Sequence, residues 1–135
     1  MRPETPAAGA APAVSVVVPV LDESAGIARF RSRLSAVCDG LGRSVEVIYV
    51  DDGSRDRSLE ILTDIAARDP RTLVVALARN VGQHAAVLAG FAHARGDVVV
   101  TIDADLQNPP EKIPRLLAEV DAGFDVVGTR RAARV

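Results

Sequence analysis

The sequence predicts an α/β domain in which a mostly parallel β-sheet is flanked by helices. Short segments rich in Val and Ile alternate with stretches whose apolar residues recur every three or four positions. The short segments are apolar at successive positions, as is typical of parallel strands that are buried on both faces. Strand–helix–strand units in series are joined by right-handed crossovers and produce a mostly parallel sheet.

Five segments are predicted to be strands. They are short, β-branched and separated by polar stretches, and they cover Val14–Val20, Val45–Val50, Thr72–Ala78, Val98–Ile102 and Asp125–Gly128. Residues 1–13 are rich in Pro and Ala and have no periodicity, which predicts a disordered leader. The folded domain is therefore expected to cover residues 14–135.

Helical periodicity fills the gaps between the predicted strands. The apolar residues of the four helices are Ile27, Phe30, Leu34, Val37 and Leu41, then Leu59, Leu62 and Ile65, then Val87, Leu88 and Phe91, and finally Ile113, Leu116, Leu117 and Val120. Asn108, two prolines and Glu111 predict a capped start for the last helix. Asn80 and Gln83 form a weaker version of the same pattern before the third helix.

Composition excludes several classes of protein. The length of 135 residues suits one domain. The net charge of -2 produces no positive electrostatic field that would attract nucleic acid. Cys38 is the only cysteine, so no intrachain disulfide forms. The apolar run Val14–Leu21 is too short to span a bilayer, and no cleavable signal is evident, so we expect a soluble, cytoplasmic chain. The first strand is followed by no dinucleotide fingerprint, and no Walker loop is present.

Acidic residues follow three of the predicted strands. Asp22 and Glu23 follow the first strand, Asp51 and Asp52 the second, and Asp103 and Asp105 the fourth. In open parallel sheets, ligands bind beyond the carboxyl ends of the strands. We therefore expect these acids to converge on one rim of the sheet and to mark the functional site.

Asp103 and Asp105 are candidate ligands of a divalent cation. Residues two apart on an extended strand point the same way, and Gln107 lies close behind them. An all-oxygen set suits Mg²⁺ or Mn²⁺ better than zinc. The alternative is an Asp that merely stabilises a turn, and it is stronger for Asp51 and Asp52. Two adjacent acids at a strand end repel each other and cost stability unless something uses them, which favours a functional role for this pair as well. A preceding apolar strand and a following helix favour the cation for the Asp103 pair.

The remaining polar candidates are a histidine and three arginines. His84 falls in the first turn of a predicted helix, where histidine is usually a surface or packing residue, and neither it nor His93 is assigned a catalytic role. Arg79, Arg130 and Arg131 are candidates for gripping phosphate. Arg130 and Arg131 follow the fifth predicted strand and so belong to the same rim.

Three segments together resemble glycosyltransferase family 2, which has the GT-A fold. They are Val16–Glu23, Asp51–Asp56 and Asp103–Asp105, which are similar to the opening strand, the nucleotide-recognition motif and the metal-binding motif of that family. Asn80–Ala86 and Asp103–Glu111 further resemble the branch that glycosylates polyprenyl phosphates such as dolichol and undecaprenyl phosphate. The resemblance covers the chain from Val14 to about Arg131.

The resemblance implies a nucleotide-sugar site and a cation. Asp52 would recognise the base or ribose, with Pro19 and Glu23 lining the same pocket. Asp103 would contact the ribose or the surroundings of the cation, and Asp105 would ligate the Mg²⁺ or Mn²⁺ that bridges the donor diphosphate.

Two further roles follow from the same resemblance. Gln107 would support the cation, and Arg130 would help to hold a phosphate. Arg131 takes the role of Arg130 if the alignment shifts by one residue.

The implied reaction is an inverting, metal-dependent transfer of a sugar from a nucleotide-diphosphate sugar to a polyprenyl phosphate. Members of the branch are longer, act at the cytoplasmic face of the membrane and carry acceptor-binding segments. Since this sequence ends at Val135, we expect a GT-A sheet truncated after about the fifth strand and an acceptor half that is missing. The alternatives are a nucleotide-sugar-binding module without turnover and, lower, a phosphorelay receiver-like domain, which Lys112 disfavours because it falls in a helix.

Overall fold

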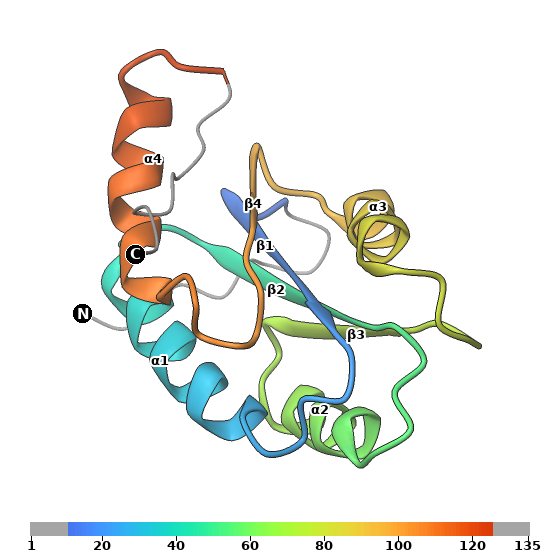
Figure 1. The fold of residues 1–135 in the computed structure, drawn as a ribbon. Helices are drawn as coiled ribbons and strands as arrows, with labels where there is room; N and C mark the ends of the chain where they lie inside the picture. Colours follow the sequence, from blue (N-terminus) through green and yellow to red (C-terminus); the bar gives the residue numbers. More distant parts are fainter. Residues whose placement is uncertain (1–10, 126–135) are drawn as a thin grey trace, which may run out of the picture.

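The computed structural model describes residues 11–125, and its core is a four-stranded parallel sheet. The strands are β1 (Val14–Val20), β2 (Val45–Asp51), β3 (Thr72–Ala76) and β4 (Val98–Thr101), in the order β3-β2-β1-β4 (Figure 1). This confirms the predicted α/β class. The predicted fifth strand lies outside the described residues, apart from Asp125.

Helices cover both faces of the sheet. They are α1 (Ile27–Gly40), α2 (Ser58–Arg68), α3 (Gln83–His93), the short 3₁₀ helix η1 (Pro110–Lys112) and α4 (Ile113–Asp121). The larger core joins the β-strands to buried side chains of α1, α2 and α4, whereas the smaller one joins Val17, Ile48 and Val50 to Ala86 of α3. Helix α3 therefore lies on one face and the other helices lie on the opposite one (Figure 1).

The buried face of α3 differs from the prediction. Leu88 and Phe91 are 52% and 43% exposed, whereas Ala86 and Gly90 are buried. A Cβ atom on Gly90 would lie 2.3 Å from Cγ1 of Val17, so α3 approaches β1 closely. Hydrophobic periodicity could not find this contact, because small residues form it.

The predicted helix caps are also absent. Neither η1 nor α3 has a side-chain cap, and Glu111 instead pairs with Arg33 of α1 (Nε–Oε2 3.1 Å). Strand β3 ends two residues before its predicted end and β4 one residue before.

The amino-terminal end of the sheet is closed by a buried polar cluster. The hydroxyl of Ser15 donates to Glu46 (2.5 Å) and accepts from the backbone N–H of Gly96 (2.8 Å). Glu46 also accepts from the backbone N–H of Arg95 (2.7 Å). Ala13 joins this end through its own N–H, which donates to the carbonyl of Ser44 (3.0 Å).

The division into a leader and a domain stays a prediction, since residues 1–10 lie outside the description.

Candidate functional site

A cavity of about 180 Å³ opens at the carboxyl end of the sheet. The loops after all four strands contribute to it, and its lining consists of Pro19, Val20, Leu21, Glu23, Asp52, Asn80, Gly82, Gln83, Asp103, Ala104 and Asp105. The chain runs from β1 to β2 and β3 on one side, then crosses to β4 on the other side of β1. This point, where the strand order reverses, is where open α/β sheets bind ligands. Five of the predicted site residues thus meet in one place.

The loop after β1 is held by the loop after β2. Asp22 has a φ of 52°, a left-handed conformation that Asp tolerates better than most residues. Its Oδ1 accepts hydrogen bonds from the backbone N–H groups of Arg55 (2.8 Å) and Asp56 (3.3 Å), and its own N–H donates to the hydroxyl of Ser54 (2.9 Å). Three hydrogen bonds therefore join the two loops.

Asp56 completes this connection. Its carboxylate accepts from the backbone N–H groups of Ser24 (3.0 Å) and Ser58 (2.8 Å). Hydrogen bonds, first from the side chain of Ser58, hold the pKa of Asp56 well below its usual range. The hydroxyl of Ser58 in turn accepts from the N–H of Glu23 (2.9 Å), which fixes the backbone of Glu23 beside the cavity.

The two adjacent acids after β2 are both buried. Asp52 is 2% exposed, and its carboxylate oxygens accept from the N–H groups of Val81 (2.8 Å) and Gly82 (3.1 Å). Asp51 accepts from the N–H of Ser54 (3.2 Å), while its Oδ1 accepts from no described residue. The expectation that something must use this acid pair is met in part by the backbone itself.

Asp103 and Asp105 line the same cavity, but not for the predicted reason. Strand β4 ends at Thr101, so a turn rather than strand alternation brings them together. The turn includes Leu106 at a φ of 64°, and Oδ1 of Asp105 accepts from the backbone N–H of Gln107 (3.1 Å). The side chain of Gln107 is exposed and is not part of the cavity lining.

Negative charge accumulates at the cavity. The pKa of Glu23 is raised, first by burial and then by the charges of Asp105, Asp56 and Asp103. Within residues 11–125, no group of three or more His, Cys, Asp or Glu side chains is arranged to hold a metal ion. Two carboxylates nevertheless fit Mg²⁺ or Mn²⁺, because these ions are commonly held by one or two carboxylates together with substrate phosphates.

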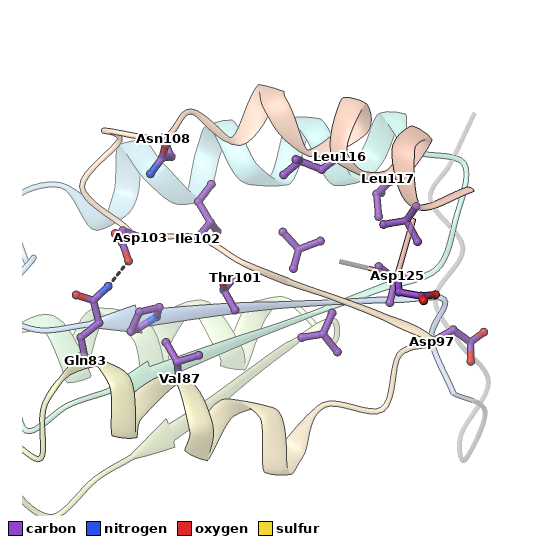
Figure 2. A pocket seen from close by; sticks show the side chains of 15 residues that line it. Gln83, Val87, Asp97, Thr101, Ile102, Asp103, Asn108, Leu116, Leu117 and Asp125 are labelled. Atoms are coloured by element: carbon purple, nitrogen blue, oxygen red, sulfur yellow. Dashed lines mark hydrogen bonds between the residues drawn. The ribbon is translucent and has the colours of Figure 1, made fainter. Parts of the chain in front are cut away.

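A second, larger cavity of about 590 Å³ runs along β4, one of the two outer strands of the sheet formed by the described residues. Figure 2 shows it between α3 and α4, with Val87 on one wall and Leu116 on the other. Gln83 and Asp103 lie at one end, joined by a hydrogen bond from Nε2 of Gln83 to Oδ1 of Asp103 (2.6 Å). Because these two residues and Pro19 line both cavities, they form the boundary between them.

Sequence reasoning placed Asp22 on the rim but missed its hydrogen bonds to the loop after β2, and it missed the contribution of Gln83. The sequence offered one signal for each residue. Asp22 follows a predicted strand, and Gln83 lies at the start of the third predicted helix, where it was expected to form part of a cap. His84 and Arg79 are exposed and do not line the acid-bearing cavity. Arg130 and Arg131 lie outside the described residues.

Fold and site together define an α/β domain with an acid-lined ligand site at the strand-order reversal. The sequence profile described as glycosyl transferase family 2 matches residues 15–135. The chain belongs to that family.

Its curated relatives confirm the resemblance to the polyprenyl-phosphate branch. The chain is 57% identical over 122 residues to the undecaprenyl-phosphate 4-deoxy-4-formamido-L-arabinose transferase of Pseudomonas aeruginosa strain LESB58, covering 90% of this chain and 36% of that protein. The transferase of the same name from Edwardsiella ictaluri is 53% identical, with 90% and 38% covered. The chain therefore spans just over a third of the length of these relatives.

Solved structures confirm the GT-A fold. The mannosyltransferase PcManGT from Pyrobaculum calidifontis, in complex with GDP-Man and Mn²⁺, aligns with a TM-score of 0.68 at 24% identity over 84% of this chain and 33% of that one. Glucosyl-3-phosphoglycerate synthase from Mycobacterium tuberculosis, in complex with Mn²⁺, UDP and glucosyl-3-phosphoglycerate, aligns with a TM-score of 0.61 at 33% identity over 84% and 40%. In the described part of the chain, no helix is long and apolar enough to cross a membrane.

Proposed function

We propose that the chain supplies the donor site of an enzyme that transfers a sugar from a nucleotide-diphosphate sugar to a polyprenyl phosphate. The observation that carries this proposal is the single cavity into which acid-bearing loops from β1, β2 and β4 all lead. The names of the 53–57% identical relatives support undecaprenyl phosphate as the acceptor and 4-deoxy-4-formamido-L-arabinose as the sugar. A location at the cytoplasmic face of the membrane stays a prediction.

The nucleotide would occupy the part of the cavity between β1 and β2. Pro19, Glu23 and Asp52 are proposed to contact its base and ribose, with Asp103 on the β4 side. Because both oxygens of Asp52 already accept backbone hydrogen bonds, its contribution includes shaping the loop that carries Val81 and Gly82. The synthase from Mycobacterium tuberculosis that aligns at 33% identity was solved with UDP, which makes UDP the first nucleotide to test.

A divalent cation is proposed to bind at Asp105, beside Asp103, and Gln107 would support it through the backbone N–H that donates to Asp105. Bound there, Mg²⁺ or Mn²⁺ would supply positive charge that stabilises the nucleoside diphosphate as it leaves. The raised pKa of Glu23 supports this assignment, because the negative charges of Asp105, Asp56 and Asp103 add to the effect of burial, which is its first cause. Arg130, or Arg131 in its place, is proposed to hold a phosphate from outside the described residues.

The proposed chemistry is a single displacement. An oxygen of the acceptor phosphate attacks the anomeric carbon from the face opposite the diphosphate, and the carbon–oxygen bond to the diphosphate breaks with its electron pair. The anomeric configuration is thereby inverted. The acceptor phosphate is already ionised at neutral pH, so no general base is required. The positions of His84 and His93, neither of which lines the acid-bearing cavity, are consistent with this.

Thermal unfolding with nucleotide sugars tests the donor site. The chain is melted with UDP-, GDP- and CDP-linked sugars, each with and without Mn²⁺, beside Asp105→Ala. A ligand at about 100 times its Kd stabilises the native state by roughly 2.7 kcal/mol, a readily measured shift. We expect one nucleotide to stabilise the chain only when Mn²⁺ and Asp105 are both present. A chain that melts cooperatively but responds to none of these donors would contradict the proposal.

The second candidate function is a module that binds the donor without turning it over. It rests on the same acid-lined cavity and requires only that the donor binds there. Product formation from a donor that demonstrably binds separates the two candidates.

A further inference from the structure

We propose that Gln83 is a positioning residue that connects the loop held by Asp52 to Asp103, so that one side chain sets the spacing between the nucleotide and cation parts of the cavity. The proposal rests on the proposed donor site. Gln83 was expected to help cap α3, yet α3 has no side-chain cap and the amide of Gln83 is directed to Asp103.

The backbone before Gln83 is fixed from the β2 side. Asp52 binds the N–H groups of Val81 and Gly82, and Gly82 has a φ of 96°, which strains any residue with a side chain. The N–H of Gly82 also donates to the side chain of Asn80 (3.1 Å). The loop therefore presents Gln83 from a defined position.

The backbone after Gln83 is fixed by the sheet. Ala86 is fully buried against β1 and β2, and Gly90 allows α3 to approach within contact of Val17 and Val50. Gln83, the first residue of α3, is consequently held on both sides. A side chain anchored in this way can orient its hydrogen-bond partner at little further entropic cost.

Asp103 directly follows Ile102, whose backbone N–H still donates to the carbonyl of Val17 in β1 (3.1 Å). Strand β4 has ended two residues earlier, and the segment then enters a turn that carries Asp105. The 2.6 Å hydrogen bond spans from α3, on one face of the sheet, to this segment (Figure 2). Hydrogen bonds to charged groups are stronger than neutral ones.

The chemistry of an amide fits this position. A lysine would neutralise the carboxylate and compete with a cation, whereas an acid would repel it. Glutamine donates a hydrogen bond and leaves the negative charge of Asp103 in place. Gln83 thus orients Asp103 without weakening the attraction between the cavity and a cation.

A double-mutant cycle tests the proposal in the full 135-residue chain. The Kd of UDP at saturating Mn²⁺ is measured by calorimetry for wild type, Gln83→Met, Asp103→Ala, which removes the acceptor, and the double variant. Met keeps the length and the helix propensity of Gln but donates no hydrogen bond. We expect Gln83→Met to weaken binding about tenfold in the wild-type background and less than about twofold in the Asp103→Ala background. His84→Met, on the same turn of α3, is the control and should bind UDP as wild type does.

A ligand-free measurement separates this proposal from the proposed function. In ¹⁵N-labelled protein, the side-chain amide resonances of Gln83 should move when Asp103 is changed to Asn and stay in place in Asp64→Asn on α2. If the amide resonances of Gln83 do not move in Asp103→Asn, the positioning role is overturned, whether or not UDP binds. The positioning role is also overturned if Gln83→Met binds UDP like wild type. The same holds if Gln83→Met loses equal affinity with Asp103 present and with Asp103 replaced. A wild-type chain that binds no UDP contradicts the proposed function, and the amide resonances then decide the role of Gln83 by themselves.

Discussion

Changing Asp52 to Asn should destabilise the chain even when no nucleotide is present. The carboxylate accepts two backbone hydrogen bonds, at 2.8 Å from Val81 and 3.1 Å from Gly82. The Asn side chain has one carbonyl oxygen and one amino group in the same positions. One of the two backbone N–H groups would therefore face another donor.

The size of the effect depends on how deeply the acceptor, Asp52, and the two backbone donors are buried. A hydrogen bond to a charged group contributes about 1.5–3 kcal/mol to stability. Asp52 is 2% exposed, whereas Val81 and Gly82 are exposed and regain water when the bond is lost, which favours the lower part of this range. We expect a loss of about 2 kcal/mol in the free energy of unfolding, which for a chain of this size lowers Tm by about 6–10 °C.

Urea unfolding in the absence of ligand measures this directly. Asp64→Asn is the matched control, because Asp64 is an exposed acid on α2 that pairs only with Arg68 four residues on among the described residues, and such pairs contribute about 0.3–0.5 kcal/mol. If Asp52→Asn and Asp64→Asn unfolded at the same urea concentration, the structural role given to Asp52 would be refuted.

Three other substitutions test the packing and the electrostatics of the site. Gly90→Ala should lose about 1–3 kcal/mol of stability, because its Cβ would lie 2.3 Å from Val17. Gly40→Ala is the control and should lose nothing, because there is open space around Gly40. Equal urea midpoints for the two variants would contradict the close approach of α3 to β1. Glu23 has a pKa raised above 4.5, so its ionisation destabilises the native state as pH rises through the raised value. Glu23→Gln should therefore raise the urea midpoint at pH 7, and its difference from wild type should become smaller towards pH 4. A difference that grows in acid would contradict a raised pKa of Glu23. Asp56 has a pKa lowered from 3.8, so it stabilises the native state above that pH and loses this effect below it. Asp56→Asn should melt below wild type at pH 7, and a Tm difference that does not shrink as the pH falls below 3.8 would show that the charge is not responsible.

The sheet and the location of the site could be predicted from the sequence because both depend on short-range patterns. Runs of Val and Ile marked β1 and β2 almost to the residue, and acids at their ends marked the rim. The face of α3 could not be predicted in this way, since Ala86 and Gly90 are buried for their small size rather than for their hydrophobicity.

The polar contacts of the site were beyond the reach of sequence patterns for a different reason. The bonds from Gln83 to Asp103 and from Asp52 to Gly82 join residues 20 and 30 positions apart. Whether a polar side chain caps its own helix or reaches another loop depends on distances that only the assembled sheet defines. Asp103 and Asp105 were correctly paired, but a turn does what strand alternation was expected to do.

The central claim is that the loops after β1, β2, β3 and β4 form one site for a nucleotide and a cation. Paramagnetic broadening tests it most directly: ¹H–¹⁵N spectra of the chain with UDP are compared in Mg²⁺ and in substoichiometric Mn²⁺. We predict that Mn²⁺ broadens the backbone amides of Glu23, Gln83, Asp103 and Asp105, and that the amides of Ser15 and Gly96, at the opposite end of the sheet, keep their intensity. Broadening that is uniform over the chain, or that is centred on Ser15 and Gly96, would contradict the claim.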